Sequence, residues 1–322
     1  MVDVSVALCT YNGAAFVGEQ LDSILAQTRR PAEIVVSDDA SGDTTVAVVR
    51  AALAGFSEAS VLENAHPLGV VGNFQQAVTA AHGELIALSD QDDRWLPEKL
   101  ERMSARFAAD PSLLFLHTDA RLIDDRGAPT GTTLFQSLEV SAADRDAVHA
   151  GEAFAVYLRR NLATGATVVF RRSLLEAALP FPAEWVHDEW LAIIAAALSG
   201  ADLMEECLTD YRRHDANQIG VADPTLRGKV GRVLQPRGDR NRGLARRAEV
   251  LVQRLETLGD RIPAGTLELA RRKLTFEATR AAMPALRVGR LAAVARLATR
   301  GDYERFASRG RADIVRDVLQ PA

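Results

Sequence analysis

The chain has 322 residues, of which 48% are hydrophobic and 25% charged, and its formal net charge is −5. This composition is ordinary for a soluble globular protein and allows one large domain or two smaller ones. The longest purely apolar run, residues 191–198, is too short to span a bilayer. Because the first residues form a strand pattern rather than a signal peptide, and Cys9 and Cys207 lie in apolar runs typical of buried thiols, we expect a cytoplasmic protein without a disulfide.

The charge is distributed unevenly along the chain. Residues 226–322 contain 22 Lys and Arg against 10 Asp and Glu, whereas residues 1–225 contain 16 against 33. The net charge therefore changes from −17 to +12, and the change falls near residue 223. We predict two regions, residues 1–222 and residues 223–322, with different roles.

The first ninety residues alternate between strand patterns and helical spacing. The expected strands are residues 2–9, 34–36, 61–62 and 85–89, and the expected helices are residues 14–28, 44–54 and 72–82. This alternation predicts an α/β fold with a parallel, right-handed, doubly wound sheet, in which ligands bind beyond the carboxyl ends of the strands. Neither a Gly-x-Gly-x-x-Gly sequence after the first strand nor a Walker A sequence is present, which disfavours a dinucleotide fold.

Three carboxylates follow the fourth predicted strand. Asp90, Asp92 and Asp93 come directly after the apolar run 85–88, and Pro97 then opens a helical pattern. Adjacent carboxylates repel one another, and a divalent cation that prefers oxygen ligands, such as Mg²⁺, Mn²⁺ or Ca²⁺, relieves that repulsion. The triplet predicts a metal site; a solvated acidic turn that caps the next helix is the alternative.

The second strand also ends in carboxylates. Asp38 and Asp39 lie where an acidic side chain accepts a hydrogen bond from a base N–H or a ribose hydroxyl. The alternative is that these residues form an Asx turn and cap the next helix.

Three motifs in this order resemble those of family 2 glycosyltransferases. They are residues 4–12, residues 37–43 and residues 88–95, and the likeness, which covers roughly residues 2–220, is strongest to bacterial rhamnosyltransferase-like members. The resemblance implies a GT-A fold, a nucleotide-sugar donor, a Mg²⁺ or Mn²⁺ ion and inversion at the anomeric carbon.

The resemblance assigns residues to the base of the nucleotide. It implies that Cys9 and Tyr11 line the base pocket, that Asp39 accepts the N3–H of uracil or thymine, and that Asn73 reaches toward the base or the diphosphate. Ala40 stands where the family usually has glycine, and we therefore expect no positive φ at this position.

The resemblance also assigns the metal site. Asp90-Gln91-Asp92 matches the Asp-x-Asp motif of the family, which implies that Asp92 binds the metal and that Asp90 binds the ribose or belongs to the metal's shell, with Gln91 at the donor. The sequence around His214 is similar to the family's Tyr-Arg-x-His-x-x-Asn element, whose histidine completes the metal or diphosphate site. An imidazole ligand favours Mn²⁺ over Mg²⁺.

The middle of the chain is expected to bind the acceptor. Residues 113–117 and 167–170 are predicted strands, residues 124–127 a hairpin turn, and residues 139–152 a surface loop with some helix. Thr164 and Gly165, ahead of the second of these strands, are similar to a family element near the donor sugar, although a simple turn also accounts for them.

His187, Asp188 and Glu189 lie between two tryptophans at the start of an apolar helix. Glycosyl transfer needs a base to deprotonate the acceptor hydroxyl, and one carboxylate is sufficient for inversion because the leaving group is a diphosphate. The resemblance favours Asp188 over Glu189 as this base, and the choice between the two stays open. The alternative is that these carboxylates only cap the helix.

The C-terminal region has helical spacing at residues 244–258, 267–276, 289–300 and 302–319, with arginines in every predicted helix. Because no nucleic-acid-binding motif accompanies the basic charge, we expect no nucleic-acid partner. A solvated face, a peripheral contact with the inner face of the plasma membrane and a homodimer contact remain as alternatives.

The predicted function is transfer of a sugar from a nucleotide-diphosphate donor to a hydroxyl of a glycan or lipid-linked acceptor, with inversion and with Mg²⁺ or Mn²⁺. The resemblance favours dTDP-rhamnose as the donor, followed by UDP-sugars. A non-catalytic nucleotide- or sugar-binding module of the same fold is the alternative, but such a module would not need a base such as Asp188.

Overall fold

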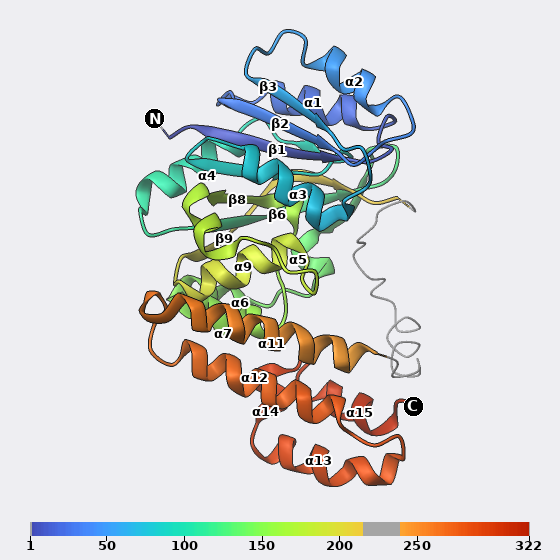
Figure 1. Cartoon of the computed structure of the whole chain (residues 1–322), viewed down its shortest axis with the longest axis vertical. Coiled ribbons are helices and arrows are strands. Elements are labelled where there is room, and N and C mark those ends of the chain that lie inside the picture. The colour runs from blue at the N-terminus through green and yellow to red at the C-terminus, as the bar shows by residue number, and fades with distance from the viewer. Residues whose placement is uncertain (1, 215–238, 322) are drawn as a thin grey trace.

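The structure is a computed structural model that describes residues 2–214 and 239–321. A nine-stranded mixed sheet forms its first part (Figure 1), with the strand order β3-β2-β1-β4-β8-β6-β9-β5 and with β7 paired to β6. The strands are β1 Val4–Thr10, β2 Glu33–Asp38, β3 Ala59–Glu63, β4 Leu85–Ser89, β5 Arg94–Trp95, β6 Phe115–Ile123, β7 Pro129–Thr133, β8 Val168–Arg171 and β9 Ala201–Arg212.

Strands β1 to β4 form the doubly wound, parallel half of the sheet that the sequence predicts. Their connections are α1 Val17–Leu25, α2 Thr45–Ala52 and α3 Gly69–Ala80. β1 pairs in parallel with both β2 and β4, and Thr10 lies opposite Asp38 while Leu8 lies opposite Ser89. The carboxyl ends of these strands therefore meet at one edge of the sheet.

The other half of the sheet is mixed. β8 runs antiparallel to β4 and β6, whereas the long strand β9 runs parallel to β6 and carries the short strand β5 on its other side. The sequence pattern predicts a strand over residues 202–208, and β9 extends four residues beyond that end. The helices of this half are α4 Lys99–Ala109, α5 Leu134–Ser137, α6 Ala142–Ala147, α7 Ala153–Arg159, α8 Leu175–Ala178 and α9 His187–Ala197.

Five helices follow at the end of the molecule away from β3 (Figure 1). They are α11 Arg240–Leu258, α12 Thr266–Ala281, α13 Arg287–Thr299, α14 Asp302–Phe306 and α15 Ala312–Leu319. The single helix predicted for residues 302–319 is therefore wrong. Two helices form instead, because the chain bends between them at residues that include Gly310, whose φ is +54°.

The C-terminal helices share a hydrophobic core with α7 and α9. Leu251 and Leu255 of α11 belong to the same buried cluster as Trp190 of α9. Trp185 donates its indole N–H to the carbonyl of Arg247 at 3.0 Å, and the Arg254 guanidinium donates to carbonyls at the end of α8 at 2.8 Å. The predicted boundary near residue 223 lies outside the described residues. No helix within the described residues is long and apolar enough to cross a membrane.

Candidate active site

The Asp-x-Asp loop lies beside the end of β1. The side-chain amide of Gln91 accepts the Tyr11 backbone N–H at 2.8 Å and donates to the Tyr11 carbonyl at 3.0 Å. Because both of its polar atoms bond one residue, Gln91 fixes the loop after β4 to the loop after β1. Tyr11 itself is 43% exposed at this edge, whereas Cys9 is buried within β1, and burial raises the pKa of its thiol.

The pKa values of Asp90 and Asp93 are raised by burial and by neighbouring carboxylates. Burial and then Asp92 and Asp188 raise the pKa of Asp90 to about 7. Burial, Asp92 and Asp90 raise the pKa of Asp93 well above its usual range. Asp93 Oδ1 accepts the backbone N–H of Arg212 at 3.0 Å, while within residues 2–214 and 239–321 its Oδ2 has no hydrogen-bond partner.

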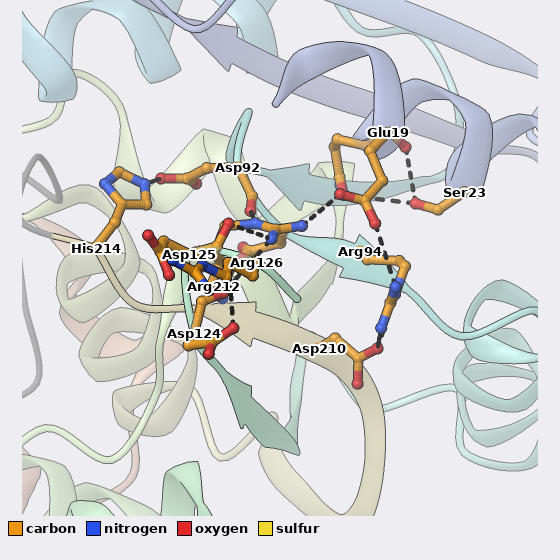
Figure 2. Close-up of polar contacts among 12 residues, drawn as sticks. Glu19, Ser23, Asp92, Arg94, Asp124, Asp125, Arg126, Asp210, Arg212 and His214 are labelled. Atoms are coloured by element: carbon orange, nitrogen blue, oxygen red, sulfur yellow. Dashed lines mark hydrogen bonds and ion pairs between the residues drawn. The ribbon is translucent and has the colours of Figure 1, made fainter. Parts of the chain in front are cut away.

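His214 contacts Asp92, as the resemblance implies for a shared metal site. Its Nε2 lies 2.8 Å from Asp92 Oδ2, and its ring stacks on Phe16 with centroids 4.9 Å apart. The two residues are 122 positions apart in the sequence, and the end of β9 brings them together (Figure 2).

These donors fit a divalent cation that has few protein ligands. In the part of the chain that the structure describes, no group of three or more His, Cys, Asp or Glu side chains is placed to hold a metal by itself. Mg²⁺ and similar ions are commonly bound by one or two carboxylates together with substrate phosphates and water. Asp92 and His214 would provide two donors of the kind such an ion needs, and the substrate's phosphates and water would provide the others.

Asp188 lies in the first turn of α9 and faces the same edge of the sheet. Its Oδ2 accepts the backbone N–H of Gly165 at 2.8 Å, and its Oδ1 accepts the N–H of Glu189 at 2.7 Å. Burial raises its pKa to about 6, and these backbone hydrogen bonds oppose the rise. Since Asp188 also raises the pKa of Asp90, the two carboxylates are close enough to interact.

The two neighbours of Asp188 have other contacts. Glu189 forms an ion pair with Arg247 of α11. His187 is buried and stacks on Phe74 with ring centroids 3.8 Å apart, and burial lowers its pKa to about 3. His187 is therefore neutral and packs in the core, and Glu189 is oriented by the C-terminal helices.

The side chains of Asp39 and Asn73 form hydrogen bonds with other residues of the protein. Asp39 accepts the backbone N–H groups of Leu68 and Gly69 at 2.6 and 2.9 Å, at the start of α3. Asn73 is buried, and its amide exchanges hydrogen bonds with Ser37 at 2.6 and 2.9 Å. Asp39 thus caps α3 rather than α2, and its role toward a nucleotide base stays a prediction.

Ala40 corrects an expectation from the sequence. Its φ is +62°, so the positive φ that we expected to be absent is present. Asp38 accounts for this conformation, because it accepts the N–H and hydroxyl of Ser41 at 2.8 and 2.6 Å and closes a tight turn around Ala40. The constraints of this turn therefore outweigh the steric preference of alanine.

Tyr211 shows that the carboxylates converge. This residue of β9 is buried, and burial followed by Asp93, Asp90, Asp92 and Asp188 raises the pKa of its phenol. All four carboxylates therefore act on the ionisation of one phenol. Tyr211 is the tyrosine of the Tyr-Arg-x-His-x-x-Asn element, in which the resemblance assigned a role only to His214.

Lys99 is a buried cation beside these carboxylates, and the sequence did not indicate it. Its Nζ donates to the Ala166 carbonyl at 2.6 Å and to the Thr209 hydroxyl at 3.1 Å, over the ring of Trp95. Burial lowers its pKa to about 7, although Asp93 and Asp90 oppose this effect. A lysine two positions after Pro97 was the only local signal.

Arg212 connects the Asp-x-Asp loop to two other segments (Figure 2). It donates through Nε to the Asp92 carbonyl at 2.8 Å, through Nη1 to the Asp125 carbonyl at 3.2 Å, and through Nη2 to the carboxylate of Glu19 on α1. Its side chain is buried. The end of β9, the β6–β7 turn and the loop after β4 are therefore held as one unit.

The fold and the site together define an α/β protein of the GT-A type, with acidic side chains at the carboxyl edge of a mostly parallel sheet. The chain belongs to the family described as glycosyl transferase family 2, whose model matches residues 5–166. The expected family and fold are thereby confirmed.

Individual proteins agree with this assignment. The chain is 29% identical over 223 residues to an uncharacterized glycosyltransferase of Nostoc sp. This match covers 66% of this chain and 66% of the relative. It is 28% identical over 198 residues, or 59% of this chain and 69% of the relative, to the Escherichia coli UDP-Glc:alpha-D-GlcNAc-diphosphoundecaprenol beta-1,3-glucosyltransferase WfgD. The fold is similar to Staphylococcus aureus TarS 1–349 in complex with UDP-GlcNAc, with a TM-score of 0.59, 17% identity, and coverage of 98% of this chain and 89% of that one.

Proposed function

We propose that this protein is an inverting glycosyltransferase that moves a sugar from a nucleotide-diphosphate donor to an acceptor hydroxyl. The observation that carries the proposal is that Asp188 is held by the backbone N–H groups of Gly165 and Glu189, separately from the Asp-x-Asp loop, and that its charge raises the pKa of Asp90 in that loop. A site that only binds a nucleotide has no need of a second, separately held carboxylate at this position.

Asp188 is proposed as the general base. With a pKa of about 6 it is ionised at neutral pH and still basic enough to accept a proton from the acceptor hydroxyl. As that oxygen forms its bond to the anomeric carbon, the bond to the diphosphate breaks with its electron pair. One displacement from the opposite face inverts the configuration, and the proton remains on Asp188 until solvent removes it.

Asp92 and His214 are proposed to hold the divalent cation, with Asp90 at the ribose or in the outer shell of the ion. When bound, a Mg²⁺ or Mn²⁺ ion supplies neutralisation of the diphosphate charge, so no protein acid is needed. The imidazole of His214 favours Mn²⁺.

The proposed base specificity depends on Asp39. A carboxylate accepts the N3–H of uracil or thymine, whereas the N3 of cytosine offers a lone pair, and the mismatch costs about 1–3 kcal/mol for an unsatisfied polar group. We retain dTDP-rhamnose as the first candidate donor from the motif likeness. The printed name of the E. coli relative supports UDP-sugars as the second and a lipid-diphosphate-linked glycan as the acceptor.

A panel of nucleotide sugars tests this function. Purified protein is incubated with dTDP-rhamnose, UDP-glucose, UDP-GlcNAc, GDP-mannose and CDP-glucose, with Mn²⁺ or with a chelator, and release of the nucleoside diphosphate is measured. We expect slow, metal-dependent hydrolysis of a dTDP-sugar or a UDP-sugar. Asp188→Asn, whose side chain has the same size but accepts no proton, is the negative control. Donors that bind with Mn²⁺ but are never consumed, with or without a lipid-linked glycan, would instead indicate a binding module.

A further inference from the structure

Large apolar side chains are exposed on the last helices. The described residues have seven strongly exposed large hydrophobic side chains, and five of them lie in or next to α13 and α15; they are Leu286, Val288, Leu291, Val315 and Leu319, with exposed fractions of 47–81%. Scattered single exposures need no explanation, but a concentration in one region does. We call these five residues the apolar surface.

The two helices that carry the apolar surface are fixed to each other. Arg290 on the inner side of α13 is buried and donates to the carbonyls of Asp317 and Gln320 at 3.2 and 2.7 Å, at the end of α15. On the outer side of α13, Val288 lies one helical turn from Leu291. The apolar surface is therefore presented by a rigid helix pair and not by a loose tail.

The carboxylates of these helices are turned inward. α13 contains no acidic residue, and the two of α15, Asp313 and Asp317, are buried. Asp317 bonds the guanidinium of the buried Arg280 at 2.6 Å. The helices therefore present no carboxylate of their own to an approaching partner.

Exposed arginines lie in or next to the same two helices. Arg287, Arg296 and Arg300 are exposed, and none of the three forms an ion pair with another described residue. A fourth, Arg311, is exposed but pairs with Glu304. The exterior of α13 and α15 thus combines aliphatic side chains with unneutralised positive charge.

We infer that α13 and α15 form a docking surface for an anionic lipid bilayer. Aliphatic side chains flanked by arginine match the boundary between acyl chains and acidic headgroups, where each basic residue contributes about 1 kcal/mol. A second copy of the chain fits less well, because a two-fold contact through this surface sets arginines against arginines. The surface lies on the C-terminal helices, so this inference stands apart from the chemistry proposed for Asp188.

Vesicle flotation tests the inference without any measurement of sugar transfer. Full-length protein is mixed with vesicles of phosphatidylglycerol and phosphatidylcholine in equal parts, or of phosphatidylcholine alone. We expect binding to the mixed vesicles that weakens as salt is added, and little binding to the neutral ones. Val288→Glu/Leu291→Glu should weaken binding about tenfold or more, because it places two carboxylates at an anionic surface.

A matched variant separates location from net charge. Ala105→Glu/Ala108→Glu adds the same charge at two exposed positions of α4 and should bind the mixed vesicles like the unaltered protein. Circular dichroism confirms that each variant is folded. Three results would overturn the inference: no binding to the mixed vesicles, equal loss in both double variants, or a concentration-dependent dimer in sedimentation that only Val288→Glu/Leu291→Glu dissociates.

Discussion

Asp188 and Glu189 are adjacent carboxylates whose environments differ. Asp188 accepts hydrogen bonds from two backbone N–H groups beside the Asp-x-Asp loop, whereas Glu189 is paired with Arg247 of the C-terminal helices. Of these two neighbours, Asp188 raises the pKa of Asp90 and Glu189 does not. These contacts favour Asp188 as the base, a choice that the sequence left open.

Asp188→Asn should lower turnover by about 10²–10⁴-fold, because the amide keeps the shape of the carboxylate but takes no proton. Donor affinity should hardly change, since the base meets the acceptor. Steady-state kinetics and calorimetry measure the two effects. Glu189→Gln is the matched control and should keep turnover; the reverse pattern would assign the base to Glu189, and loss of donor binding in Asp188→Asn would show that it is a ligand or a cap.

The pH dependence of the reaction follows from the raised pKa of Asp188. The ionised carboxylate is the active form, and the protonated form accumulates as the pH falls through about 6. We expect kcat/KM for the acceptor to fall about tenfold per pH unit below that value and to be level above it. A pH profile recorded where circular dichroism shows the folded protein checks this. A rate that stays constant down to pH 4.5 would exclude Asp188 as the base.

Ala40 offers a test of backbone strain. A left-handed conformation costs a residue with a Cβ about 1–2 kcal/mol, and the greater entropy that glycine loses on folding offsets part of the relief. Ala40→Gly should therefore raise the free energy of unfolding by about 0.5–1 kcal/mol in urea denaturation. Ala105→Gly, on the exposed face of α4, is the control and should lower it by a similar amount; a loss of stability in Ala40→Gly would argue that the turn is not strained.

At the scale of single residues, the positions of the motif residues were predictable from the sequence, but the residues that contact and hold the site were not. Asp90, Asp92 and Asp188 stand in short local patterns that indicate a strand end or a helix start. Lys99 becomes meaningful only through Ala166 and Thr209, which are 67 and 110 positions away, and such contacts leave no local signal.

At the scale of elements, strand β9 has two functions. It completes the sheet beside β6, and its last residues deliver Tyr211, Arg212 and then His214 to the loop after β4. The sequence predicts this strand only over residues 202–208, because polar residues such as Asp210 and Arg212 are more typical of a loop than of a strand. Their polar groups are satisfied by Arg94, Arg121 and the site itself.

Arg212→Lys tests whether this connection matters. Lysine keeps the charge but cannot donate at once to the Asp92 carbonyl, the Asp125 carbonyl and Glu19, so one or more buried acceptors lose their donor. We expect a loss of about 1–3 kcal/mol in the free energy of unfolding, together with weaker Mn²⁺ affinity. Arg121→Lys is the control, since this half-exposed arginine bonds only Asp210 among the described residues and should cost under about 1 kcal/mol. If both substitutions changed the free energy of unfolding and the Mn²⁺ affinity equally, the contacts of Arg212 would not be important for the site.

At the scale of the molecule, the C-terminal helices pack against the part that contains the sheet, through the hydrophobic core that α11 shares with α9. The charge asymmetry predicts a separate basic region, but two of its arginines are internal: Arg280 pairs with buried carboxylates, and Arg290 bonds backbone carbonyls. Charge counts do not reveal such burial. The parallel half of the sheet was predictable from its alternating pattern, whereas the mixed half depends on pairings between strands far apart in the sequence.

We propose that Asp90, Asp92 and Asp188 belong to a metal-dependent nucleotide-sugar site. The most direct test of this proposal is calorimetric titration of UDP, dTDP and CDP into the unaltered protein, Asp92→Ala and Asp125→Ala, each with Mn²⁺ and with a chelator. Asp125 is an exposed turn residue that contacts Arg212 through its carbonyl alone, so its variant controls for loss of a nearby acid.

We expect UDP or dTDP to bind the unaltered protein and Asp125→Ala only with Mn²⁺, CDP to bind more weakly, and Asp92→Ala to weaken metal-dependent binding about 10–100-fold. Asp92→Ala with unchanged nucleotide affinity in the presence of Mn²⁺ would contradict the proposal.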